Sequence, residues 1–326
     1  MTEWPIDWRA VVDEAIRRRK NEGLSQRSLA DLAGVSPPTV NAFEQGEVRL
    51  QFERVIAILE ALGLFLRPGA PDSFAAFRHN ARRRWDELVS PLPDDHPSRQ
   101  PLGHFEQAYE IIGLDQTPSP RALKLLLEKI PKTSGWPPFW VATRSDLRPT
   151  TDEGLVECWL GRPGTDRAFD DAAHSDFWQV SRAAQAYLRR GFQEDGRDNR
   201  EPGTIFDLTL PIWRTAEVLL HAARLARVLG GHEETVVHLT ARYAGLEGRE
   251  LISWAQPLLR TVLDQRYRAR STRIDLEIFT DVFKIENELE AVVDVFLEPL
   301  YERFDGYRLT DELVSSQLAD LRRAER

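Results

Sequence analysis

This chain has little cysteine and no long apolar run. Its 326 residues include one cysteine, Cys158, which excludes an intramolecular disulfide and any zinc site built on several thiolates. No stretch approaches about 18 consecutive apolar residues, so we predict no transmembrane helix. Residues 1–10 lack the apolar core of a signal peptide. We therefore expect a soluble protein that stays in the cytoplasm and has no membrane partner.

The sequence is also short of positive charge. It carries 43 Lys and Arg against 52 Asp and Glu, a net charge of −9, which argues against a polyanion as partner because phosphate contacts need cations. The acidity is uneven: residues 1–66 contain 8 basic and 10 acidic residues, residues 67–103 contain 6 and 5, and residues 104–326 contain 29 and 37. The C-terminal two thirds therefore holds most of the negative charge.

Motifs for catalysis and metal binding are missing from the sequence. The seven histidines are scattered, without His-Glu-x-x-His spacing: His79, His96, His104, His174, His221, His232 and His238. His174, Ser175 and Asp176 are adjacent, and adjacent side chains do not generally point at one another as a catalytic triad requires. Residues 245–248 lack the Lys-Ser/Thr that completes a phosphate-binding loop. We predict no cofactor, no metal site and no enzymatic activity.

The first 66 residues have the pattern of five short helices. Apolar residues recur at helical spacing from Trp8 to Asn21 and again from Phe52 to Leu62. Between these two segments, Ser25 and Ser36 can each cap a helix, and Gly34 supplies a tight turn. A fifth helix would be a single turn beyond the fourth. The pattern predicts an all-α N-terminal domain at residues 1–66.

Residues 24–46 have the spacing of a helix-turn-helix. Apolar Leu29, Val35 and Phe43 would pack two helices at a steep angle, and small Ala30 and Gly34 let their backbones approach. Several stretches resemble the Cro/phage-repressor (XRE) family in register, namely Leu24-Ser25-Gln26, Leu29-Ala30, Ala33-Gly34-Val35-Ser36, Thr39-Val40 and Glu44-Gln45-Gly46. The resemblance covers about residues 8–66. It implies a DNA-binding domain whose second motif helix enters the major groove.

The resemblance implies roles for individual residues. It gives Gln26 a phosphate contact and a part in supporting the second helix of the motif, which would read the bases. The residues that it places toward the groove are Pro37, Pro38, Asn41 and Ala42, which read bases, and Thr39 beside the DNA backbone. Because proline and alanine cannot make bidentate hydrogen bonds to bases, Asn41 is the one side chain here suited to an adenine edge. Apolar contacts to thymine methyl groups and DNA shape would supply the remaining specificity.

Phosphate contacts are expected from Arg27, Ser36, Thr39 and Arg49, and from the helix N-termini, whose free N–H groups favour an anion. The basic run at residues 17–20 fits either phosphate contact or a solvated helix face. Glu44 is interpreted as a structural partner for an arginine of the same domain. With so few cations a monomer would bind weakly, so we predict a homodimer on a palindromic operator.

The remainder of the chain divides at a proline-rich segment. Residues 67–103 are predicted to be a linker with a short basic helix at 73–88, followed by a larger α+β domain at 104–326 with an antiparallel sheet. Alternating residues predict strands at 156–160, 206–210 and 235–243. Helices are predicted at 213–229 and 289–304, with a kink at Pro299. The apolar stripe at 289–304 fits a dimer seam and a buried helix equally well.

A distinctive run in the larger domain is not explained by these elements. Residues 175–195 and 203–213, with stretches near 134–139 and 243–248, loosely resemble a module fused in bacteria to Schlafen-type AlbA domains, and no biochemical role comes with that resemblance. A pocket for a planar or anionic ligand could be lined by Trp136, Trp140, Trp178, Trp213, Trp254, Arg189, Arg190 and Arg214, although such residues are more often core. We expect a dimerisation or sensor domain with a small-molecule, nucleotide or protein effector.

Taken together, these features predict a sequence-specific transcriptional regulator that binds double-stranded DNA as a dimer. We expect it to repress its own promoter, to associate with the nucleoid when bound, and to serve mobile-element or defence control. Two alternatives stay open. One is an antitoxin-like protein whose C-terminal domain neutralises a partner protein, and the other is a DNA-directed enzyme such as a nuclease.

Overall fold

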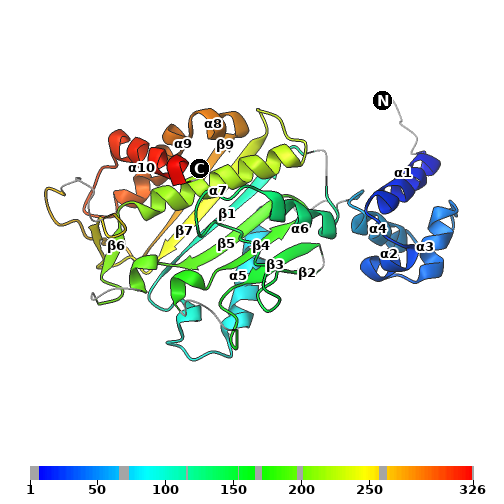
Figure 1. The fold of residues 1–326 in the computed structure, drawn as a ribbon, viewed down its shortest axis with the longest axis horizontal. Helices are drawn as coiled ribbons and strands as arrows, with labels where there is room; N and C mark the ends of the chain where they lie inside the picture. The colour runs from blue at the N-terminus through cyan, green and yellow to red at the C-terminus, as the bar shows by residue number, and fades with distance from the viewer. Residues whose placement is uncertain are drawn as a thin grey trace.

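The fold consists of two domains that lie side by side (Figure 1). The computed structural model describes residues 7–65, 73–114, 117–152, 154–165, 171–196, 201–256 and 263–324. Residues 7–65 form a small helical domain, and the residues from 73 onward form a larger domain around a seven-stranded sheet. Within the described ranges, no helix has the length and apolar content needed to cross a bilayer.

The small domain consists of α1 (Trp8–Asn21), α2 (Gln26–Ala33), α3 (Pro37–Glu44) and α4 (Phe52–Ala61). The hydroxyls of Ser25 and Ser36 accept hydrogen bonds from backbone N–H groups three residues on, so both predicted caps are confirmed. Gly34 turns the chain between α2 and α3 with φ of 63°, a conformation that favours glycine. Residues 62–65 hold no fifth helix, because Gly63 at φ of 73° ends α4. Pro68 and Pro71 of the predicted linker lie outside the described residues.

The large sheet is antiparallel throughout, as predicted. Its spatial order is β2 (Thr150–Asp152), β3 (Leu155–Trp159), β4 (Phe177–Ser181), β5 (Gln185–Gly191), β1 (His104–Ile112), β7 (Val236–Ala244) and β9 (Arg273–Asp281). A separate pair, β6 (Ile205–Asp207) and β8 (Glu250–Ile252), is parallel. The three predicted strands are present as β3, β6 and β7. The second is shorter than expected because the Asp207 carboxylate accepts hydrogen bonds from the N–H groups of Thr209 and Leu210 and starts a helix there.

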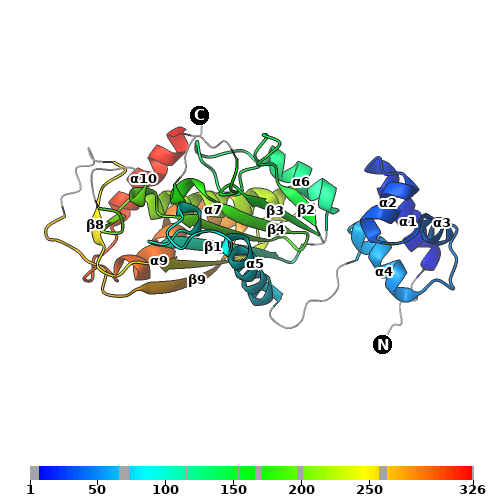
Figure 2. The ribbon, with the colours of Figure 1, turned by 90° about the horizontal axis from the view of Figure 1, so that it is seen from below.

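Different helices cover the two faces of the sheet. One face packs on α6 (Pro120–Lys129), α7 (Leu210–Val228), α8 (Val282–Asn287) and α9 (Leu289–Tyr301), and α10 (Asp311–Ala324) packs on α7 and α9. The other face packs on α5 (Ser73–Val89). Figure 2 shows α5 on the opposite side from α6 and α10. Short 3₁₀ helices occupy Pro97–Arg99, Ala172–His174 and Gln193–Asp195. The helix predicted at 73–88 is therefore present as α5, and its apolar face packs against the sheet.

The apolar stripe predicted at residues 289–304 is buried within the chain. Seven side chains of α9 are buried, from Leu289 to Tyr301, where α9 packs against α7, α10 and β9. The Tyr301 hydroxyl donates a hydrogen bond to the Leu208 carbonyl at 2.6 Å. Pro299 lies inside α9, which continues to Tyr301. This stripe is consequently part of the core of one chain and is not exposed for a second copy.

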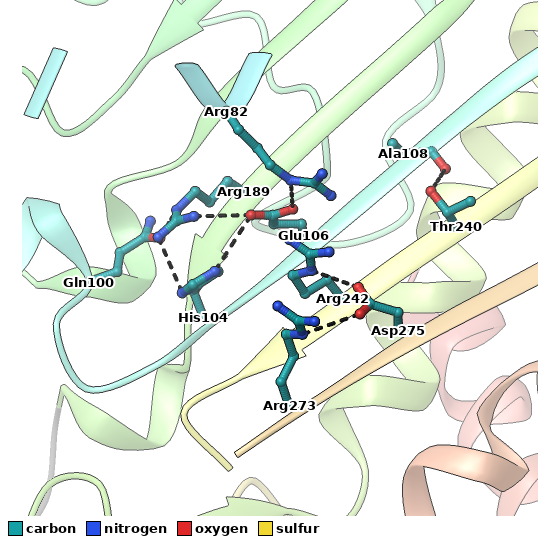
Figure 3. Close-up of polar contacts among 10 residues, drawn as sticks. All are labelled: Arg82, Gln100, His104, Glu106, Ala108, Arg189, Thr240, Arg242, Arg273 and Asp275. Carbon is teal, nitrogen blue, oxygen red and sulfur yellow. Dashed lines mark hydrogen bonds and ion pairs between the residues drawn. The ribbon is translucent and has the colours of Figure 1, made fainter. Parts of the chain in front are cut away.

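A row of charged side chains crosses the α5 face of the sheet (Figure 3). Cross-strand partners place Arg189, Glu106, Arg242 and Asp275 side by side, with alternating charge. Glu106 is buried and also pairs with Arg82 of α5, at 2.6 Å, while Arg189 lies 3.0 Å from its other oxygen. This row therefore holds α5 to the sheet as well as joining neighbouring strands.

The ionisation of Glu106 follows from these contacts. Burial acts to raise the pKa of this carboxyl group, but hydrogen bonding to His104 and the charges of Arg82 and Arg189 outweigh burial, and the pKa falls from 4.5 to about 2. Since the folded-state pKa lies below the ordinary value, the carboxylate stabilises the fold at neutral pH. That stabilisation is lost as the pH falls from about 4.5 toward 2.

Replacing Glu106 by Gln tests this network. We expect E106Q to lower the free energy of unfolding by about 3–5 kcal/mol at pH 7, because two half-buried arginines lose their charged hydrogen-bond partner. The variant should also show a weaker dependence of stability on pH between about 4.5 and 2. Urea unfolding followed by circular dichroism at several pH values measures both effects.

Asp275→Asn is the matched control. Asp275 pairs with Arg242 and Arg273, at 2.6 and 3.2 Å, but its side chain is 50% exposed. We therefore expect a loss below about 1 kcal/mol. Equal losses in the two variants would contradict the role given to Glu106.

Candidate nucleic-acid interface

One carboxylate connects three helices of the small domain. Glu44, at the end of α3, accepts hydrogen bonds from Arg19 of α1 (Nη2–Oε2, 3.0 Å) and from Gln26 at the start of α2 (Nε2–Oε2, 2.7 Å). Burial acts to raise the pKa of Glu44, but these hydrogen bonds outweigh burial and leave the pKa lowered. Glu44 is therefore ionised at neutral pH, and its predicted arginine partner is confirmed as Arg19.

The end of α3 is also held by Trp8 of α1. The Trp8 ring packs edge-on against Phe43, with ring centroids 5.5 Å apart, and its indole N–H donates to the Gly46 carbonyl at 3.1 Å. Phe43 and Val40 are buried against α2 in the core of the small domain. These contacts fix the inner side of α3 and leave the start of the helix outside the core.

Most of the predicted DNA-facing residues lie on the surface. Exposed side chains belong to Arg27, Ser36, Pro37, Pro38, Asn41 and Arg49, whereas Gln26 and Ala42 are half-buried. Figures 1 and 2 both show α3 on the side of the small domain that faces away from the larger domain. The larger domain therefore leaves the exposed side of α3 accessible.

Thr39 does not lie as the sequence predicts. It is 6% exposed, and its hydroxyl shares a hydrogen bond of 2.8 Å with the Ser36 hydroxyl. Ser36 Oγ also accepts a hydrogen bond from the Thr39 N–H, at 3.4 Å. The Thr39 side chain therefore completes the cap of α3 and does not extend freely toward a groove.

The basic run at residues 17–20 lies partly against the larger domain. Arg18 donates to the Thr117 carbonyl at 3.0 Å, and the Ser119 hydroxyl donates to Glu22 at 2.6 Å. Arg17 pairs with a glutamate of its own helix. Sequence reasoning missed this contact between domains, because Arg18 and Thr117 are 99 residues apart. Among residues 17–20, Lys20 is therefore the exposed cation that forms no ion pair with a described residue.

Two exposed apolar side chains flank Arg49 in sequence. Val48 is 78% exposed and Phe52 is 75% exposed. Phe52 begins the apolar residues that the sequence shows at helical spacing, but as the first residue of α4 it lies beyond the core. Apolar atoms beside a cation suit contact with thymine methyl groups and sugars.

The tryptophan and arginine residues of the larger domain do not form one pocket. Trp178 is fully buried in the core. Arg190 pairs with buried Asp176 at 2.5 Å, and Arg189 pairs with Glu106. Arg189 and Arg190 are neighbours on β5 and therefore point to opposite faces of the sheet, so they cannot line one pocket. Of the two possibilities that the sequence left open for these residues, Trp178 belongs to the core.

The groups considered for chemistry in the larger domain have other partners. His174 lies 2.7 Å from Asp171, while Asp176 is held by Arg190, so the adjacent triad residue types do not join. Burial raises the pKa of the Cys158 thiol to about 12. Among the described residues, no three His, Cys, Asp or Glu side chains are grouped to hold a metal ion.

Substitution of Glu44 by Gln tests how α3 is held in the small domain. We expect the amides of α3 to exchange hydrogen faster, with a loss of local stability of about 1.5–3 kcal/mol, because a charged hydrogen bond to Arg19 is lost. Hydrogen exchange followed by mass spectrometry measures it. Glu47→Gln is the control: Glu47 is exposed, and its side chain bonds to no described residue, so a change within about 0.5 kcal/mol is expected. Unchanged exchange in E44Q would refute the role of Glu44.

Comparisons with known proteins match this domain. A family model described as "Helix-turn-helix" matches residues 16–64. An uncharacterized HTH-type transcriptional regulator of Haemophilus influenzae is 35% identical over 54 residues, which are 17% of this chain and 55% of that protein. The chain thus spans about half the length of this curated relative. No solved structure matches. With α2, the Gly34 turn and α3 arranged as described, residues 16–64 belong to the Cro/phage-repressor (XRE) family of helix-turn-helix domains.

Proposed function

We propose that this protein is a sequence-specific DNA-binding transcriptional regulator. The observation that carries the proposal is the exposed start of α3, where Pro37, Pro38 and Asn41 lie on the outer side of a helix-turn-helix domain. The similarity to a protein named as an HTH-type transcriptional regulator supports the same function. In this proposal the chain acts in the cytoplasm, associates with the nucleoid when bound to DNA, and has no enzymatic activity.

Base reading in this proposal falls mainly on Asn41. Its amide both donates and accepts, as an adenine edge in the major groove requires, while Pro37, Pro38 and half-buried Ala42 offer apolar contacts to thymine methyl groups. The N-terminus of α3 and the exposed Arg27 and Arg49 would hold phosphates. Gln26 would act through Glu44, since its amide donates to that carboxylate.

Charge supports a dimeric complex. Residues 1–66 contain 8 basic and 10 acidic residues, and Arg18 and Arg19 are engaged by the Thr117 carbonyl and by Glu44. Few cations are left for phosphates, so one domain would bind weakly. Two copies on a palindromic operator double the phosphate contacts. We further propose that the dimer represses its own promoter.

Asn41→Ala should weaken binding to the upstream DNA of the gene by about 1–3 kcal/mol, because the only bidentate base contact of α3 is lost. Asn21→Ala is the matched control, since Asn21 is an exposed asparagine at the far end of α1. Gel shifts at about 150 mM salt with upstream and random DNA measure both. Equal retention of the two DNAs by the unmodified protein would sink the proposal of a specific regulator.

The salt dependence of binding tests the dimer. Arg49→Ala should make the slope of log K against log salt less steep by about 0.9 for each Arg49 at the DNA, hence about 1.8 for a dimer. Arg266→Ala serves as control, because this 78% exposed arginine belongs to the larger domain. A change of only about 0.9 would indicate a monomeric complex.

A further inference from the structure

A cavity of about 440 Å³ lies beside the sheet in the larger domain. Its wall is formed by the second half of α6, the segment of residues 130–143, and the middle of α7. Its volume is within the range of small-molecule sites, about 300–1,000 Å³. Neither the helix-turn-helix domain nor the ion pairs on the α5 face use this cavity.

Cations without carboxylate partners surround the cavity. Lys124, Lys132 and Arg148 all line it, and none of the three forms an ion pair with a described residue. Lys124 donates to the Pro149 carbonyl, Arg148 donates to the Thr143 carbonyl, and Lys132 lies over the ring of Trp140. This group concentrates positive charge in a chain whose net charge is −9. It favours an anionic ligand.

A buried carboxylate with a free oxygen lies in the same wall. Glu217 of α7 is 1% exposed, and Arg214 donates to its Oε2 at 2.8 Å. Its Oε1 is buried and has no hydrogen-bond partner among the described residues. A buried acceptor of this kind destabilises the fold unless it is paired. An N–H donor on a ligand would satisfy it.

Aromatic and strained groups complete the wall. Trp140 is half-buried and lines the cavity. Phe139 has φ of 53°, which a bulky residue rarely adopts, and strain of this kind gathers at ligand sites. The Phe139 ring packs on His221, whose pKa burial and the charge of Arg224 lower to about 3, so its imidazole is neutral. A flat, partly apolar group fits such surroundings.

We propose that this cavity binds a mononucleotide. The phosphate would pair with Lys124, Lys132 and Arg148, the base would lie against Trp140, and an N–H group of the base would donate to Glu217 Oε1. Neutral His221, which shares a hydrogen bond with the Tyr109 hydroxyl at 2.8 Å, adds a polar group without charge. Binding at this site involves no covalent step.

The cavity is one helix away from the DNA-binding domain. Lys124, Leu127 and Glu128 of α6 line it, and Ser119, which caps the other end of α6, donates to Glu22 of α1. Ligand binding at one end of α6 can therefore bias the contact with the small domain at the other end. This extension, unlike the site itself, depends on the proposed DNA binding.

Isothermal titration calorimetry on the full chain tests the site. We expect at least one of AMP, GMP, CMP and UMP to bind, and the matching nucleoside and inorganic phosphate to bind about tenfold more weakly or worse, because each lacks one set of contacts. The double variant Lys132→Glu with Arg148→Glu should lower affinity about tenfold or more. Glu217→Gln should lower the affinity for the nucleotide without changing the affinity for phosphate.

Lys129→Glu is the matched control, because Lys129 is an exposed lysine of α6 that does not line the cavity. Its affinity should equal that of the unmodified chain. Absence of binding by all four nucleotides at about 10 mM, well above the usual range of ligand affinities, would overturn the site. So would equal affinity of the double variant, or phosphate alone binding as tightly as the nucleotide.

DNA affinity measured with and without the nucleotide tests the extension. A change in DNA affinity must appear reciprocally as a change in nucleotide affinity when DNA is present. A nucleotide that binds while leaving DNA affinity unchanged would refute the coupling through α6. Because the calorimetry uses no DNA, failure of the site and failure of DNA binding give different results.

Discussion

The larger domain depends on the two-sided burial of β1, an interior strand of its sheet. Side chains of β1 alternate between the faces of the sheet, so Gln107 and Tyr109 reach α7 while Glu106 reaches α5. A shift of one residue in register would exchange these sets and place a carboxylate in the apolar core. The positions of α5 and α7, and through α7 the wall of the cavity, follow from this alternation.

In the small domain the arrangement of the helices depends on one ionised carboxylate, that of Glu44. Glu44 is held by α1 and α2, and the Trp8 indole holds the end of the same helix. The inner side of α3 is thus determined by the domain's own contacts. Its outer side carries proline, asparagine and alanine, which gives few hydrogen bonds for base reading and makes shape and symmetry of the DNA important in the proposed function.

Ion pairs distinguish the cations that stabilise the fold from the cations that could bind a ligand. Many arginines of the chain are held by carboxylates, as Arg82, Arg189 and Arg190 are. Exposed Arg27 and Arg49 near α3, and the three cations around the cavity, have no ion pair with any described residue. An acidic protein can therefore offer anions two places to bind, because net charge says nothing about which cations are already neutralised.

The sequence by itself determined the small domain, since its caps, its Gly34 turn and its helical spacing are local signals. It also predicted the α+β class and the strands β3 and β7. Tertiary structure decided the strands β1, β4, β5 and β9, the packing of α5 on the sheet, the burial of Thr39 and the exposure of Phe52. These features depend on partners far apart in the chain: Glu106 meets Arg82 and Arg189 across 24 and 83 residues. No local pattern records such contacts, so only the folded chain shows which charges are paired and which remain free to bind.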